Sequence, residues 1–182
     1  MKFEKKSIPD VIRVVPTVHV DARGFFMETW QSRQFADGGI DVSFVQDNFS
    51  TSSRGTLRGL HYQVEQAQGK LVRVVRGRVF DVAVDLRRSS KYFGKWVGEE
   101  LSAENKHQLW VPPGFAHGFL VLSESADFEY KCSDFYAPEH ERCIRWDDPD
   151  IGIEWPIDAG VQPVLSDKDA AAPSLSQADT YP

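Results

Sequence analysis

The sequence has few cysteines, no long apolar run and no excess of basic residues. Its 182 residues include only Cys132 and Cys143. A chain of this length can bury a core without disulfides, so we expect both to be free thiols. No window approaches the roughly 18 apolar residues of a membrane span, and the charged start MKFEKKSIPD lacks the apolar run of a signal peptide. We therefore expect a cytoplasmic protein with no membrane partner.

The charge balance and several missing motifs exclude further functions. A formal net charge of −6 lacks the basic field that general nucleic-acid binding requires. No Walker motif, dinucleotide glycine motif or Gly-x-Ser-x-Gly elbow is present, which argues against ATP, NAD and serine-esterase chemistry. We expect no cofactor and no nucleic-acid partner, although a few local arginines could still hold one small anion.

Short alternating runs separated by Gly, Pro, Asn and Asp fill most of the chain. They predict strands over Phe25–Trp30, Phe44–Phe49, Lys95–Leu101, Gln108–Val111, Gly118–Leu122 and Phe128–Cys132. In the last of these, Phe128, Tyr130 and Cys132 share one face. The run KLVRVVRGRVFDVAVDL is typical of a hairpin turned at Arg76 and Gly77, whose second arm places Phe80, Val82, Val84 and Leu86 on one apolar face.

Helix is scarce in this pattern. One short helix is predicted over Ser32–Asp37, with a serine N-cap and a stop at Gly38. Many short strands at close spacing favour a mainly β fold, an antiparallel jelly roll or β-sandwich with a few short helices. The length fits one domain over residues 1–182, with an irregular and partly mobile C-terminal segment over about 158–182.

The stretch LRGLHYQ places His61 on a predicted strand, where it could be a metal ligand, a catalytic base or a hydrogen-bonded core residue. A metal-binding jelly roll would use a second histidine two residues later, on the same face, together with a later histidine. His117 supplies the later one, but Gln63 stands in place of the second. Two imidazoles and an amide make a poor transition-metal site, so we expect no metal.

Polar residues accompany His61 on the faces predicted to point inward. Gln46, Asn48, Lys70, Tyr130 and His117 are too many for a dry core, because each buried polar group needs a partner, so a polar cavity accounts for them better. Arg23 and Arg58 each adjoin a glycine and suit a diphosphate, unless both form surface ion pairs. An imidazole, a phenol, an ammonium and carboxylates favour proton transfer next to a carbonyl over acyl transfer.

These motifs occur together in a known pattern. The segments DARGFFMETW, FVQDNFS, LRGLHYQ, QGKLVRVVRGRVFDVAVDLR, QLWVPPGFAHGF and LSDKDAAAPSL appear in that order. Over about residues 1 to 175 the sequence resembles the dTDP-4-dehydrorhamnose 3,5-epimerases. The resemblance implies a dimeric, cupin-type jelly roll that is metal-free in catalysis. It also implies conversion of dTDP-4-dehydro-6-deoxy-D-glucose to dTDP-4-dehydro-β-L-rhamnose, for later reduction to dTDP-L-rhamnose.

The resemblance also assigns roles to individual residues. His61 is implied as the base, Asp169 as the partner that orients it, Tyr130 as the acid on the opposite face, and Lys70 as the cation beside the enolate. The implied substrate contacts are Arg23, Glu28, Gln46, Asp47, Asn48, Arg58, Lys70, His117, Glu141 and Lys168. Family members exchange an N-terminal strand, so that one subunit lines the site of its neighbour.

Three other functions stay open at this point. Relatives within the fold epimerise only C3 or only C5 of a dTDP-4-keto-6-deoxy sugar, and the sequence does not separate them from a 3,5-epimerase. A non-catalytic nucleotide-sugar-binding jelly roll would not need His61, Lys70, Tyr130 and Asp169 together. A metal-dependent cupin oxygenase is disfavoured by Gln63.

Overall fold

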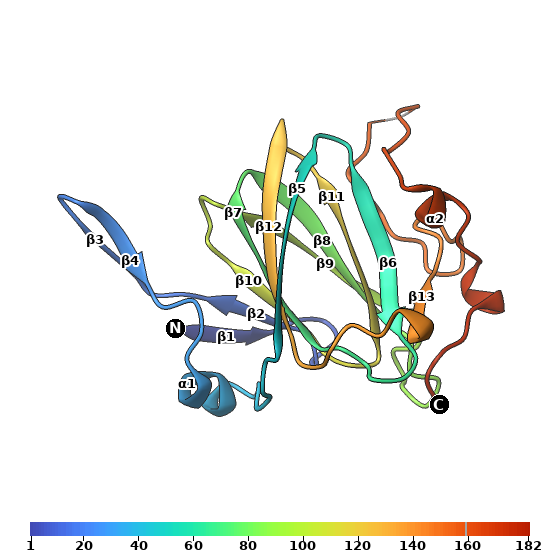
Figure 1. Ribbon diagram of the computed structural model, residues 1–182, viewed down its shortest axis with the longest axis horizontal. Helices are drawn as coiled ribbons and strands as arrows, with labels where there is room; N and C mark the ends of the chain where they lie inside the picture. The colour runs from blue at the N-terminus through green and yellow to red at the C-terminus, as the bar shows by residue number, and fades with distance from the viewer. Residues whose placement is uncertain (159) are drawn as a thin grey trace.

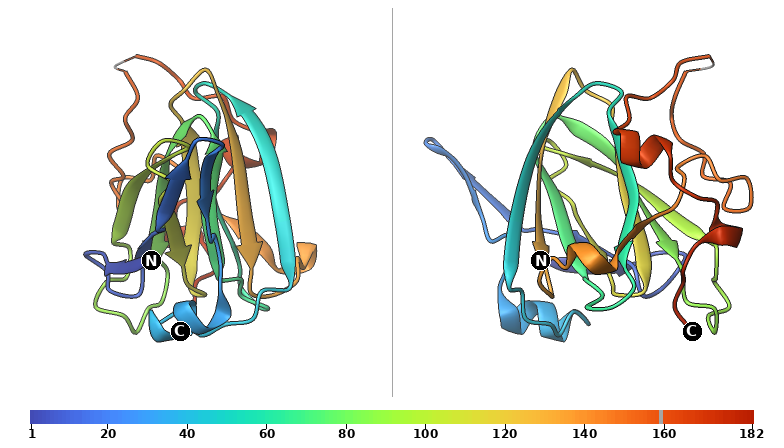
Figure 2. Two further views of the ribbon diagram at one scale, coloured as in Figure 1. Left: turned by 90° about the vertical axis from the view of Figure 1, so that its left-hand side faces the viewer. Right: turned by 45° about the vertical axis from the view of Figure 1, so that its right-hand side comes forward.

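The computed structural model describes residues 1–158 and 160–182, in which two antiparallel sheets face each other (Figures 1 and 2). The six-stranded sheet runs in the order β1 (Lys2–Lys5), β2 (Ile12–Val15), β10 (Gln108–Val111), β7 (Lys70–Arg76), β12 (Ser125–Cys132) and β5 (Gln46–Ser53). The five-stranded sheet runs in the order β13 (Glu141–Cys143), β6 (Leu57–Gln63), β11 (Phe115–Val121), β8 (Arg78–Asp85) and β9 (Trp96–Ser102). This arrangement confirms the predicted mainly β sandwich.

Alternation along the strands builds the core between the sheets. On β12, Phe128 and Cys132 are fully buried and Tyr130 packs against the same cluster, so the predicted shared face is confirmed. Phe128 stacks on Phe119 of the opposite sheet with ring centroids 4.1 Å apart. Apolar side chains fill the space behind this stack, and Tyr130 lies where the apolar core gives way to polar residues.

The predicted hairpin at Arg76 and Gly77 is wrong. Both arms are strands, β7 and β8, but β7 pairs with β10 and β12, whereas β8 pairs with β11 and β9 in the other sheet. Gly77 is therefore the corner at which the chain crosses between sheets. Its φ is 79°, and a Cβ there would lie 2.1 Å from the Ser125 carbonyl oxygen, so only glycine fits. Strand alternation is the same on both sides of a hairpin turn and of a sheet-crossing corner.

The apolar face predicted on β8 is present, but it faces away from the second sheet. Val82, Val84 and Leu86 pack with Leu175 and other residues of the C-terminal part of the chain. That part is mostly irregular, with α2 (Asp167–Ala170) and the 3₁₀ turn η2 (Leu175–Gln177), and it lies outside the five-stranded sheet (Figure 2, right). It buries one face of this sheet and brings α2 beside β6.

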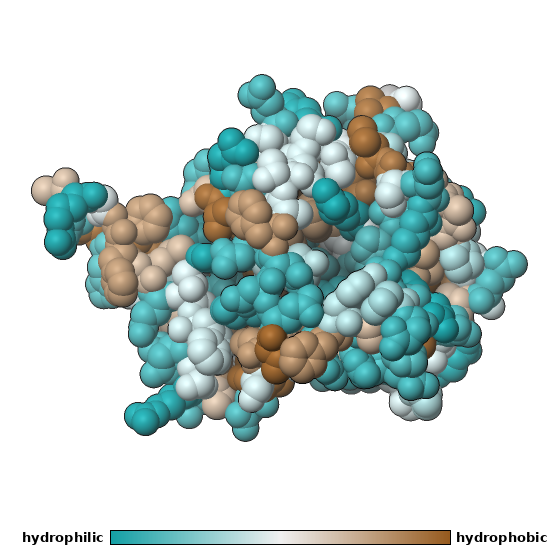
Figure 3. All heavy atoms as spheres, in the orientation of Figure 1, coloured by the Kyte–Doolittle hydropathy of each residue, from teal (hydrophilic) through white to brown (hydrophobic). Residues whose placement is uncertain are grey.

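The N-terminal region forms a protruding hairpin, called the arm below, made of β3 (Val18–Asp21) and β4 (Gly24–Met27) (Figure 1). Its apolar side chains lie in solvent: Val20 is 78% exposed, Phe25 58% and Phe26 67%. Figure 3 shows hydrophobic atoms, in tan and brown, along this projecting part of the molecule. The predicted strand over Phe25–Trp30 is thus shorter, and within residues 1–158 and 160–182 its phenylalanines belong to none of the three core clusters.

The helix α1 (Ser32–Asp37) has the predicted bounds and ends at Gly38. Its N-cap, however, is Gln31, whose side-chain oxygen accepts a hydrogen bond from the Gln34 backbone N–H, so the predicted serine cap is wrong by one residue. A third apolar cluster, which includes Phe35 of α1, covers one end of the six-stranded sheet. None of the helices in residues 1–158 and 160–182 is long and apolar enough to cross a membrane.

Candidate functional site

His61 lies on the inner half of β6 and forms a close pair with Asp169 of α2. Its Nε2 is 2.5 Å from Asp169 Oδ1. Burial opposes ionisation of Asp169, yet the hydrogen bond from His61 keeps the pKa of this carboxyl below its usual value. An ionised carboxylate only accepts, so Nε2 carries the hydrogen and Nδ1 is left as the basic atom. Near His61, β6 lies very close to β11. A Cβ on Gly59 would be only 2.6 Å from Gly118 Cα, so the close approach requires glycine at this position.

A second histidine–aspartate pair lies beside the first on the same sheet. His117 of β11 is the direct cross-strand partner of His61, and its Nε2 lies 2.9 Å and 3.0 Å from the two carboxyl oxygens of Asp81 on β8. Burial raises the pKa of Asp81, although His117 and Lys70 oppose the rise. The His117 ring also stacks on Phe128, which fixes its plane against the core.

The six-stranded sheet contributes the groups opposite the histidines. In its pairing register Lys70, Cys132 and Gln46 form one row, and Tyr130 and Asn48 form part of the next. Burial lowers the pKa of Lys70, although nearby Cys132 and Glu141 oppose the change. Burial likewise raises the pKa of Tyr130, which keeps its phenol protonated. This sheet therefore presents a partly buried amine and a protonated phenol on one face.

The edge of the site is formed by charged side chains from β6, β13 and α2. Lys168 Nζ lies 2.6 Å from Glu141 Oε2, and Lys168 immediately precedes Asp169. Burial opposes ionisation of Glu141, but Lys168 holds its pKa below the usual value. Arg58 donates from Nε to Ser52 Oγ at 3.0 Å. Tyr130 lies within electrostatic range of both Arg58 and Glu141, so the two sheets and the C-terminal segment converge on one place.

Three of the predicted contact residues lie apart from this group within the chain. Arg23 is at the tip of the arm, paired with Asp21, and Glu28 accepts a hydrogen bond from Gln34 near α1. The side chain of Asp47 points to the outer face of the six-stranded sheet, where it pairs with Lys131. A single chain thus brings together His61, Asp169, Tyr130, Lys70, Gln46, Asn48, Arg58, His117, Glu141 and Lys168, and leaves Arg23, Glu28 and Asp47 outside.

The sequence matches a known protein family over nearly its whole length. The profile of the dTDP-4-dehydrorhamnose 3,5-epimerase family matches residues 5–177. The chain belongs to this family. It is 60% identical to the dTDP-4-dehydrorhamnose 3,5-epimerase of Pseudomonas aeruginosa, with 100% of both chains covered. The chain is therefore an isomerase, a carbohydrate epimerase of dTDP-rhamnose biosynthesis, as the resemblance implied.

Two solved structures show how widely this epimerase fold is used. The 3,5-epimerase of Legionella pneumophila, crystallised with dTDP-4-keto-L-rhamnose, matches with a TM-score of 0.94 and 52% identity over 98% of this chain and 94% of that chain. A 3′-monoepimerase of Streptomyces bikiniensis, in complex with dTDP-quinovose, matches with a TM-score of 0.88 and 37% identity over 97% of this chain and 88% of that chain. The cupin-like fold is therefore shared by epimerases of different scope.

The predicted gap in the metal-ligand pattern has a structural counterpart in this epimerase. The amide of Gln63 is buried and engaged, with Nε2 donating to the carbonyls of Gln66 and Phe135 and Oε1 accepting from the Ala137 N–H. Both polar atoms of this amide are therefore engaged by backbone groups. Within residues 1–158 and 160–182, no three His, Cys, Asp or Glu side chains are grouped so as to hold a metal ion.

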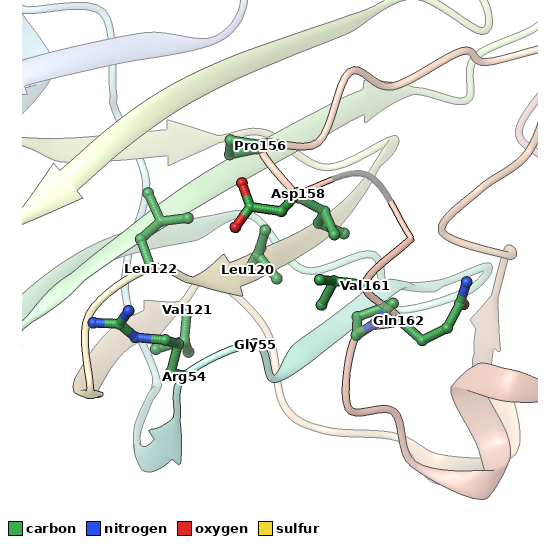
Figure 4. Close-up of a pocket in the computed structure, with 11 residues that line it drawn as sticks. Arg54, Gly55, Leu120, Val121, Leu122, Pro156, Asp158, Val161 and Gln162 are labelled. Carbon is green, nitrogen blue, oxygen red and sulfur yellow. The ribbon is translucent and has the colours of Figure 1, made fainter.

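A separate hollow of about 180 Å³ lies at the turn between β5 and β6, against the C-terminal segment (Figure 4). Its charged lining residues are Arg54 and Asp158, and Leu120, Leu122 and Val161 supply apolar walls. No imidazole, phenol or amine lines it among the described residues, and none of the predicted site residues reaches it. This hollow therefore differs in chemistry from the group of residues around His61.

Sequence reasoning missed two residues of this site. Asp81 sits on the inner face of β8 between Val79 and Ala83, and a carboxylate on an otherwise apolar buried face was the available signal. Tyr136 donates from its phenol to Glu141 Oε2 at 2.9 Å, but it lies in the irregular segment after β12, where no periodicity marks an inward side chain.

Proposed function

We propose that this chain inverts C3 and C5 of dTDP-4-dehydro-6-deoxy-D-glucose to give dTDP-4-dehydro-β-L-rhamnose, with His61 as base and Tyr130 as acid. The observation that carries the proposal is that His61 projects from the five-stranded sheet and Tyr130 from the six-stranded sheet facing it. A sugar ring held between the sheets would meet a base on one face and an acid on the other, as inversion at carbon requires.

The ketone at C4 makes the protons on both neighbouring carbons acidic, so one base can serve two inversions. His61 Nδ1 takes the proton, and Asp169 stabilises the imidazolium that forms. The electrons move to the C4 oxygen, and Lys70 stabilises the enolate by donating a hydrogen bond to it. Tyr130 then gives a proton to the carbon from the opposite face, and exchange with solvent deprotonates His61 and reprotonates Tyr130 before the second inversion. Its raised pKa supports this role, because the phenol stays protonated until the enolate carbon takes the proton.

Deuterium incorporation from solvent tests the proposed reaction. Incubation with the substrate in D₂O, monitored by NMR, should place deuterium at both C3 and C5 of the product. Deuterium at one carbon would support the alternative function, a C3 or C5 mono-epimerase of another deoxysugar pathway. We consider this alternative because the chain is also similar to the Streptomyces monoepimerase. Deuterium at neither carbon would overturn the enzymatic reading. In Tyr130→Phe, exchange should continue while product formation falls; normal rates of both would remove Tyr130 as the acid.

We further propose that the enzyme is a homodimer whose arm completes the partner's site. The arm exposes Val20, Phe25 and Phe26, and Arg23 at its tip lies apart from its own chain's site, where the diphosphate would be held by Arg58. Arg23→Ala and His61→Ala should each be inactive as homodimers. Mixing them should restore about a quarter of wild-type activity, since half the dimers then carry one intact site. If mixing restores no activity, the arm does not complete the partner's site.

The expected cytoplasmic location stays a prediction.

A further inference from the structure

The segment Asp134–Ala137, between β12 and β13, is held by glutamine side chains. Gln68 Nε2 donates to the Asp134 carbonyl at 2.9 Å, and Gln63 Nε2 donates to the Phe135 carbonyl at 3.2 Å. From the other direction, the backbone N–H of Tyr136 donates to Gln46 Oε1 at 2.9 Å. Each of four successive residues thus has a backbone group bound by a glutamine, with Ala137 completing the set.

Gln63 is the centre of this arrangement. It binds two residues of the segment at once, because its Oε1 accepts from the Ala137 N–H at 3.0 Å while its Nε2 reaches Phe135. The side chain is buried, so an apolar replacement would leave these backbone groups unpaired away from water. The three glutamines come from three different parts of the chain: β5, β6 and the loop before β7. The segment is therefore fixed to both sheets.

The residue between the two Gln63 contacts is Tyr136, and its phenol points to the site. It donates to Glu141 Oε2 at 2.9 Å, the same oxygen that lies 2.6 Å from Lys168 Nζ. That hydrogen bond raises the pKa of Tyr136, so the phenol remains a donor. A continuous series of contacts thus runs from the Gln63 amide through Tyr136 to the Glu141–Lys168 pair at the edge of the site.

We propose that Asp134–Ala137 is a fixed wall of the site and that Gln63 is a positioning residue that acts through Tyr136 on the Glu141–Lys168 pair. This inference rests on the proposed function and on the substrate contacts of Glu141 and Lys168 that the family resemblance implies. The wall sets substrate affinity and leaves the proton transfers by His61 and Tyr130 unchanged. The Gln63 side chain acts here by binding the backbone of Gln66, Phe135 and Ala137.

The test compares Gln63→Met, close in shape but without hydrogen bonds, with Tyr136→Phe and the double variant. Gln63→Met should raise KM about tenfold with kcat within about threefold of wild type, because binding made equally in ground and transition states affects only KM. The double variant should have the KM of the worse single variant, since both substitutions break one series of contacts. Hydrogen exchange of the amides of Tyr136 and Ala137 should accelerate in Gln63→Met.

Asn105→Leu is the matched control. Asn105 also binds three backbone groups, Glu100 O, Ser102 N and His107 N, in a loop away from the site. It should lose comparable stability with unchanged KM. If Gln63→Met does not fold, Gln68→Met removes only the bond to Asp134 and should show a smaller rise in KM of the same kind.

The outcomes separate the two levels of the proposal. A wild-type enzyme that incorporates no deuterium overturns the proposed function and this role with it. A wild-type enzyme that epimerises, with Gln63→Met within twofold of its KM, overturns the positioning role alone. The same holds if the KM effects of Gln63→Met and Tyr136→Phe multiply, because independent effects would mean that Gln63 does not act through Tyr136.

Discussion

Two histidine–aspartate pairs lie side by side on the five-stranded sheet, and they differ in how they are built. In the outer pair, His61 is 29% exposed and meets Asp169 from a segment 108 positions away in the chain. In the inner pair, His117 is 8% exposed and meets Asp81 on the neighbouring strand. The two residue types thus form one solvent-accessible pair, between segments far apart in the sequence, and one buried pair between neighbouring strands.

The environment of each aspartate separates their uses. The hydrogen bond from His61 keeps the pKa of Asp169 low despite burial, so an anion stands behind the imidazole. Burial instead raises the pKa of Asp81, which weakens the anion behind His117. The more accessible imidazole is thus the one whose aspartate has a lowered pKa. This difference supports the proposal that His61 transfers the proton and that His117 has a fixed, hydrogen-bonding role.

Removing the two imidazoles in turn is the strongest test of this assignment. His61→Ala should lower deuterium exchange at both C3 and C5 by about a thousandfold, within the range for loss of a general base. His117→Asn should retain exchange at both carbons within about tenfold and act mainly on KM. NMR of the sugar protons in D₂O measures both. Normal exchange at one carbon in His61→Ala would mean that a second base exists, and His117 would be the first candidate.

Changing the two aspartates should give a smaller contrast in the same direction. Asp169→Asn should lower kcat by about a hundredfold, because a neutral amide neither stabilises the imidazolium nor holds the tautomer with Nδ1 free. Asp81→Asn should lower it less than tenfold. Steady-state rates at saturating substrate provide the measurement. Equal losses in the two variants would show that the inner pair takes part in proton transfer after all.

Some residues of the site could be predicted from the local sequence pattern and others could not. Alternation along a strand identifies which face a side chain takes, so the inward face of Tyr130 and the shared face of His61 and Gln63 followed from local pattern. Alternation does not say which strands pair, and so the corner at Gly77 was taken for a hairpin turn. Asp169 lies on a four-residue helix in a segment without periodicity, and only the family resemblance identified it.

Contacts between distant segments were the other gap. The placement of Asp134–Ala137 depends on glutamine side chains whose partners are backbone groups, and backbone groups carry no sequence signal. Nor could the local pattern reveal that the C-terminal segment covers the apolar face of β8. A strand shows the same apolar face whether a second sheet or an irregular segment packs against it.

The smallest expected effect is on stability, where the two aspartates should show opposite pH trends. The folded pKa of Asp169 lies below its unfolded value near 4, so its stabilisation is present above that value and is lost as pH falls through the folded pKa. Asp169→Asn should therefore cost about 1–2 kcal/mol at pH 7 and progressively less below pH 4.

The folded pKa of Asp81 lies above its unfolded value, so the unfolded chain ionises first as pH rises and the stability contributed by Asp81 declines from about pH 4 upward. Asp81→Asn should therefore cost less at pH 7 than at pH 4, the reverse of Asp169→Asn. Urea unfolding of the wild type and both variants between pH 3 and pH 7 measures the trends. If both costs grew with pH, Asp81 would be ionised like Asp169, and the inner pair would be an ion pair able to support a base.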